Sequence, residues 1–145
     1  MNPFFLPYLA VLLGTIAYAW CVGGRPEKYI AALLAAMLVD PVYHWAAGES
    51  TYISIDLWHF LLDLAVLVAA VWLALGADRI WPLFFAAFQL VTTLGHLFRL
   101  VRVEMPEIVY AILIRAPSYL MIATLLVGTA LHHRRMRNRS DALPG

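Results

Sequence analysis

The sequence predicts an all-α integral membrane protein, folded as a compact antiparallel bundle of five transmembrane helices. Of the 145 residues, 63% are hydrophobic and only 13% are charged, whereas a soluble domain is about half apolar and about a quarter charged. The apolar residues form long uninterrupted runs, which is typical of spanning helices and not of the short alternating strands of a membrane barrel. The lipid bilayer is therefore the expected partner, and the net charge of +1 is too small to favour nucleic acid.

Five apolar runs are separated by short polar turns, and each run is long enough to cross a bilayer. We expect spans at roughly 4–22, 27–47, 54–75, 80–101 and 106–132. Together they form a transmembrane domain over residues 1–133, followed by a basic, flexible tail over 134–145. Pro26, Pro82 and Pro106 stand at or beside the start of a run, where the missing N–H costs least. Connections this short predict that neighbouring helices run antiparallel.

The distribution of positive charge orients the bundle, because cytoplasmic loops are enriched in Lys and Arg. Five spans place the two termini on opposite sides. One side collects Arg25, Lys28, Arg79, Arg134, Arg135, Arg137 and Arg139. The other side collects Arg99 and Arg102, partly offset by Glu104 and Glu107. The first side is therefore expected to be cytoplasmic and the N-terminus outside, in a multi-pass protein of a bacterial inner (cytoplasmic) membrane.

Ionisable side chains inside the spans all fall in the half of the bundle that is expected to face outside. Asp56, His59 and Asp63 are spaced i, i+3, i+7 and so share one face of their helix. Further polar residues at helical spacing are Asp40 and His44 on the second span, and Gln89, Thr92, His96 and Arg99 on the fourth. Ionisable groups in hydrocarbon usually face a protein interior, so these stripes predict a polar cavity lined by Asp56, Gln89, Thr92 and Arg99.

His59 and His96 both lie roughly 7 Å from the outer boundary, at about 1.5 Å rise per residue. They could be axial ligands of a haem b held between the third and fourth spans. They could instead join other ligands in a transition-metal site of mixed imidazole and carboxylate groups, made of Asp40, His44, His59, Asp63 and His96. A third alternative is that each histidine only hydrogen-bonds a neighbouring aspartate.

Asp63 and Arg115 also share a depth, roughly 12–13 Å from the outer boundary. The pattern predicts a buried ion pair that sets the register of the third and fifth spans. The alternative is that Arg115 binds an anionic head group or substrate.

Two functions are consistent with this sequence. The first is a site protein whose Asp/His/Arg cluster binds a metal, a haem or a small polar ligand. The second is an accessory or assembly subunit of a larger membrane complex, with other membrane subunits or a second copy of this chain as partners, in which the cluster is structural. No nucleophile elbow, Gly-rich phosphate loop or zinc-protease helix is present, so the sequence leaves open whether the chain is an enzyme. An ion channel is disfavoured, because polar groups are expected in the outer half only.

Overall fold

The computed structural model describes residues 5–39, 57–101, 104 and 106–142. Within these ranges the structure is helical and has no strand, which confirms the all-α part of the predicted fold class. The five spans and their orientation stay predictions. The helices are α1 (Phe5–Val22), α2 (Arg25–Met37), α4 (Leu57–Gly76), α5 (Trp81–Leu100) and α6 (Glu107–Asp141). The end of the expected span 27–47 and the start of the expected span 54–75 lie outside the described residues.

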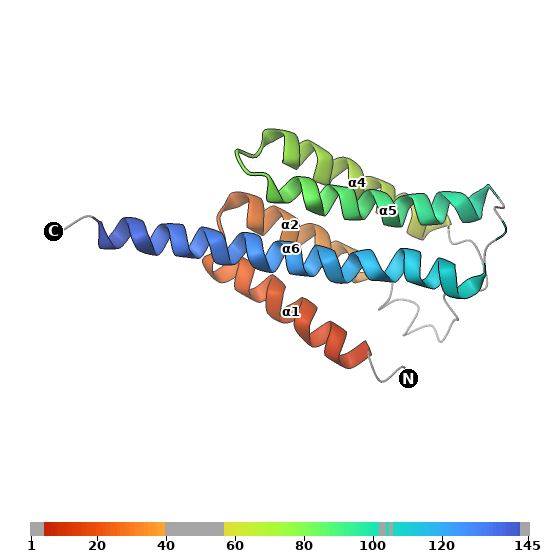
Figure 1. Ribbon diagram of the computed structural model, residues 1–145, viewed down its shortest axis with the longest axis horizontal. Coiled ribbons are helices and arrows are strands. Elements are labelled where there is room, and N and C mark those ends of the chain that lie inside the picture. Colours follow the sequence, from red (N-terminus) through yellow and green to blue (C-terminus); the bar gives the residue numbers. More distant parts are fainter. Residues whose placement is uncertain (1–4, 40–56, 102–103, 105, 143–145) are drawn as a thin grey trace.

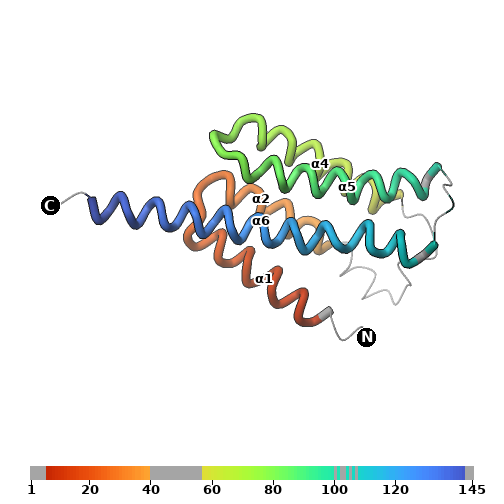
Figure 2. The backbone as a smooth tube through the Cα atoms, viewed as in Figure 1, coloured from red at the N-terminus to blue at the C-terminus, as the bar shows by residue number. Residues whose placement is uncertain are grey.

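The helices lie side by side, and α5 packs against both α4 and α6 (Figure 1). The α1–α2 turn and the α4–α5 turn lie at the end of the bundle from which α6 continues to the C-terminus. The tube in Figure 2 follows the same path, with the N- and C-termini at opposite ends. Helices that follow each other through these short turns therefore run antiparallel, as the turn lengths predict.

The helix starts follow from local chemistry. At the start of α2, the Gly24 N–H donates to Glu27 Oε2 at 3.0 Å, and Pro26 occupies the first turn. Pro82 takes the equivalent place in α5, and Pro106 directly precedes α6. Each proline thus stands where its missing N–H removes no intrahelical hydrogen bond.

The last helix differs from expectation, because α6 does not end near residue 132 but continues to Asp141. The basic segment is therefore helical instead of loose. Its arginines are good helix formers, and neither glycine nor proline interrupts it. At 35 residues and about 1.5 Å per residue, α6 is longer than the ~30 Å hydrocarbon core of a bilayer. Pro117 lies inside this helix.

The core is formed by residues at helical spacing on the facing sides of the helices. Its buried members are Leu12, Ile16, Ala19, Ile30, Ala31, Leu34, Val66, Ala70, Phe85, Ala86, Met121, Ile122 and Leu125. The outward face of α4 is also apolar, since Val68, Trp72 and Leu75 are 62%, 78% and 79% exposed. Soluble proteins rarely expose apolar surface on this scale. Among the described helices, α4, α5 and α6 are long and apolar enough to cross a membrane.

A glycine sets the closest approach of α5 and α6. A Cβ atom placed on Gly128 would lie 2.7 Å from the Cδ2 and Cε2 atoms of the Trp81 ring. An indole ring cannot yield as a flexible side chain can, so the two helices are held at a spacing that only glycine permits.

We expect Gly128→Ala to lower the free energy of unfolding by about 1–3 kcal/mol, the usual cost of overpacking a filled site. Thermal and denaturant unfolding of the detergent-solubilised protein would measure it. Gly14→Ala is the matched control, because a Cβ there meets nothing within 4 Å and alanine favours the helix. Equal stability of the two variants would contradict the packing described for Gly128.

Candidate metal centre

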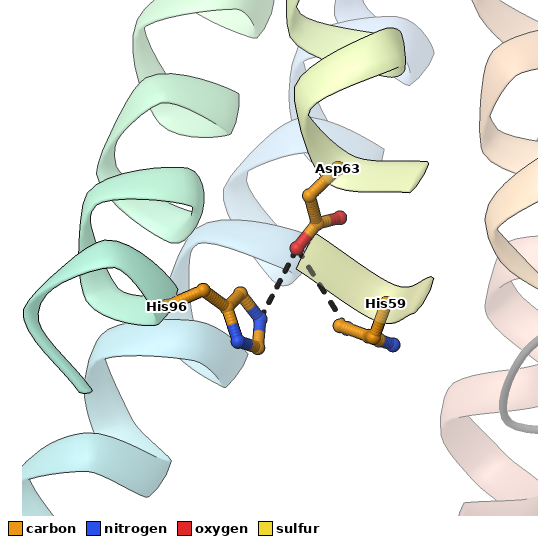
Figure 3. Close-up of side chains that lie close together, drawn as sticks. All are labelled: His59, Asp63 and His96. Carbon is orange, nitrogen blue, oxygen red and sulfur yellow. Dashed lines mark ion pairs between the residues drawn. The ribbon is translucent and has the colours of Figure 1, made fainter. Parts of the chain in front are cut away.

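Three ionisable side chains from two neighbouring helices meet inside the bundle (Figure 3). His59 and Asp63 lie one turn apart on the inward face of α4, and His96 faces them from α5. Asp63 Oδ2 is 3.1 Å from His96 Nε2 and 3.7 Å from His59 Nε2. One ligand atom from each residue lies within 4.8 Å of the other two. The group could therefore hold a metal ion.

The Asp63 carboxylate is buried, with its side chain only 1% exposed. Gln89 Nε2 donates to Asp63 Oδ1 and to the Asp63 backbone carbonyl, each at 3.1 Å. Gln89 is itself fully buried, so its amide is a fixed donor that sets the plane of the carboxylate. This leaves Oδ2 directed at the two imidazoles.

The contact between Asp63 and His96 is close, yet it is not a hydrogen bond. Neither Asp63 Oδ2 nor His96 Nε2 has a hydrogen-bond partner among the described residues, although both atoms are buried. A buried polar atom without a partner is costly. Two ligands of one tetrahedral zinc ion, at bond lengths of about 2.0–2.2 Å, place their donor atoms roughly 3.3–3.6 Å apart without bonding to each other. The observed separations from Asp63 Oδ2, 3.1 Å to His96 Nε2 and 3.7 Å to His59 Nε2, lie on either side of that range.

Tyr110 at the start of α6 supports His96 from its other side. The Tyr110 hydroxyl lies 3.0 Å from His96 Nδ1, and the Arg99 guanidinium stacks on the Tyr110 ring at 4.6 Å. Metal-binding histidines usually donate their second ring N–H to an oxygen, which fixes the tautomer. In the tautomer in which Nδ1–H donates a hydrogen bond to the hydroxyl, Nε2 keeps its lone pair for a metal.

Of the five predicted metal ligands, the structure brings together His59, Asp63 and His96. Asp40 and His44 lie outside the described residues, as does the predicted cavity residue Asp56, and all three stay predictions.

The other residues predicted to line the cavity have distinct places in the structure. Gln89 orients the Asp63 carboxylate, as described above. Thr92 is buried, but its hydroxyl donates to the Phe88 carbonyl of its own helix at 3.4 Å. Arg99 stacks on the ring of Tyr110, which contacts His96.

The Asp63 carboxylate contacts the side chains of His59, His96 and Gln89. Arg115 is an exposed residue of α6. The Asp63–Arg115 ion pair therefore stays a prediction that no contact described here supports. The prediction rested on the similar depth of the two residues along their helices. Depth alone does not define the direction in which each side chain points.

The geometry favours a metal ion over haem b. Two axial histidines must have iron and the flat macrocycle between them. Here the imidazole centroids are 4.8 Å apart, with the rings tilted at 57°. Asp63 Oδ2 contacts both rings and occupies the space that the macrocycle would need.

Sequence reasoning missed Tyr110. The residue lies one turn after Pro106 at the start of its span, and nothing in its spacing distinguishes it from the other aromatic residues. No protein-family model, curated protein or solved structure matches this chain, so the case for the site depends on its own geometry.

We expect Gln89→Leu to destabilise the protein by about 1–3 kcal/mol, because Asp63 Oδ1 would stay buried without a donor. Thr93→Val is the control on the same helix. The Thr93 hydroxyl donates only to the Gln89 carbonyl one turn earlier, at 2.9 Å, and such bonds add little to stability. Urea unfolding in detergent would compare the two variants, and similar losses would show that the Gln89 amide is not needed by the carboxylate.

Proposed function

We propose that this chain binds a divalent transition-metal ion at His59, Asp63 and His96, in a multi-pass protein of a bacterial inner membrane. One observation carries the proposal: Asp63 Oδ2 and His96 Nε2 are buried 3.1 Å apart, and neither has a hydrogen-bond partner in the described part of the chain. The second imidazole and the supporting groups, Gln89 and Tyr110, are what such a centre requires.

The donor set selects the class of ion. Two imidazole nitrogens and one carboxylate oxygen suit zinc and ferrous iron. Calcium and magnesium favour sites made of oxygen atoms, and copper(I) favours sulfur. Zinc sites with three protein ligands keep an open position for water or substrate, unlike closed structural sites. The His59 side chain is 25% exposed, so we place the open position beside this ring.

The proposed topology has five spans with the N-terminus outside. Its support is the gathering of positive charge at one end of the bundle, where Arg25, Arg79 and the basic end of α6 lie (Figure 1). In this orientation the metal centre lies in the periplasmic half of the bundle. An ion would reach it from the periplasm.

Metal analysis tests the proposed centre. Protein purified in detergent and titrated with Zn²⁺ or Co²⁺ is expected to bind one ion, with the absorption spectrum of Co²⁺ reporting nitrogen and oxygen ligands. We expect His96→Ala to weaken metal binding by more than about a hundredfold. Losing only a group that hydrogen-bonds to a metal ligand costs about tenfold to a hundredfold, and His96 is proposed as a ligand itself. His133→Ala is the matched control, because His133 is an exposed histidine on α6 and should leave binding unchanged.

A Tyr110→Phe variant extends the same titration. The ring is kept and only the hydroxyl on His96 Nδ1 is lost, so a tenfold to about a hundredfold loss is expected. Wild-type protein that binds no more metal than His96→Ala would overturn the proposed function. Normal binding by Tyr110→Phe would instead remove only the supporting role of the hydroxyl.

Reporter fusions test the proposed topology. Green fluorescent protein joined after Gly145 is expected to fluoresce, because it folds in the cytoplasm, whereas alkaline phosphatase at the same position should be inactive. The opposite pair of results would reverse the orientation and place the metal centre in the cytoplasmic half.

A further inference from the structure

A second polar cluster, part of which is buried, lies at the other end of the bundle, and we call it the latch cluster. It consists of Glu27 on α2, Arg79 in the α4–α5 turn and His132 on α6. Glu27 is fully buried. This overturns the expectation that ionisable residues inside the bundle are confined to the other half. The residue pattern does not predict this cluster, because Glu27 has the position of a first-turn residue and Arg79 that of a loop cation.

Both oxygens of the Glu27 carboxylate have donors. Oε1 accepts from Arg79 Nη1, and Oε2 accepts from the Gly24 N–H at 3.0 Å. A Cβ atom on Gly24 would lie 3.1 Å from His132 Cε1 and 3.2 Å from Glu27 Oε2. The α1–α2 turn is therefore in close contact with the imidazole and the carboxylate together.

The protonation state of His132 follows from its contact with arginine. Arg79 Nη2 lies 3.0 Å from His132 Nδ1. A guanidinium can only donate hydrogen bonds, so Nδ1 must accept. In this arrangement the ring is neutral and carries its proton on Nε2.

A second proton on His132 would convert this contact into a repulsive one. Nδ1 would become a donor facing another donor, and two positive groups would be adjacent. The groups that face the ring are Glu27 from α2, whose two oxygens are already occupied, and Arg79 from the turn. On α6 itself the neighbouring residues are His133, Arg134 and Arg135, all exposed. The described residues of α1 and α5 add no charged side chain to the cluster.

We propose that the latch cluster is a pH-operated switch that holds α6 to the bundle. Neutral His132 ties α6 to Arg79, and through Arg79 to Glu27 and the α1–α2 turn. Protonation of the imidazole releases this end of α6, together with the basic helical segment that continues to Asp141. The α1–α2 turn, the α4–α5 turn and α6 lie together at this end of the bundle (Figures 1 and 2). Protonation of the His132 imidazole would therefore loosen the contacts among all three. The switch does not depend on the metal centre.

Hydrogen–deuterium exchange of the full chain in detergent tests the switch. Amides around His132 and at the start of α2 are followed from about pH 8 to about pH 5, the range in which imidazoles gain a proton. Rates are corrected for the intrinsic pH dependence of exchange. We expect wild-type amides there to exchange about ten to a hundred times faster at the acid end, the effect of losing a hydrogen bond to a charged group.

His132→Asn is the central variant, because the Asn amide oxygen can accept from Arg79 but cannot take up a proton in this range. Its exchange is expected to stay slow at both pH values, whereas His133→Asn should follow the wild type. Arg79→Gln removes the cation, so we expect fast exchange of these amides at every pH. This variant serves as the test if His132→Asn does not fold. The proposal is overturned if wild-type exchange does not change with pH, or if His132→Asn or Arg79→Gln keeps the full acid response.

Discussion

A carboxylate that is 1% exposed inside an apolar bundle costs several kcal/mol unless other groups compensate its charge, and the arrangement around Asp63 follows from that cost. Gln89 satisfies one oxygen, and two imidazoles surround the other. Because these groups come from both α4 and α5, they meet only when the two helices are in register. Tyr110 adds α6 to the same set through His96. The centre therefore depends on the packing of three helices.

The two polar clusters stand at opposite ends of an apolar middle. Along α5 and α6, Phe85, Met121 and Leu125 lie between the clusters, and all three are fully buried. In a membrane, lipid is as apolar as these side chains, so burying them gives little preference for one helix arrangement over another. Directional contacts at the two ends define the register that the apolar middle leaves open. Close packing, such as that of Gly128 on Trp81, then sets the distance between helices.

Much of the fold and part of the site could be predicted from the residues alone. Uninterrupted apolar runs located the helices, and the spacing of His59 and Asp63 put both on one face. Depth along the spans correctly paired them with His96. Depth gives only the position along the helix axis, however, and not the direction of a side chain around it. Tyr110 and the partners of Glu27 depend on that direction, which is set by how the helices pack together.

One helix joins both clusters. α6 carries Tyr110, which contacts His96, and His132, which contacts Arg79. A helix is stiff along its axis, so α6 links the two clusters at opposite ends of the bundle. Pro117 lies between Tyr110 and His132, and a proline inside a helix breaks one hydrogen bond of the ladder and lets the axis bend. Pro117 is nearer in sequence to Tyr110 than to His132, so a bend at Pro117 would move the longer segment, which carries His132, relative to the metal centre.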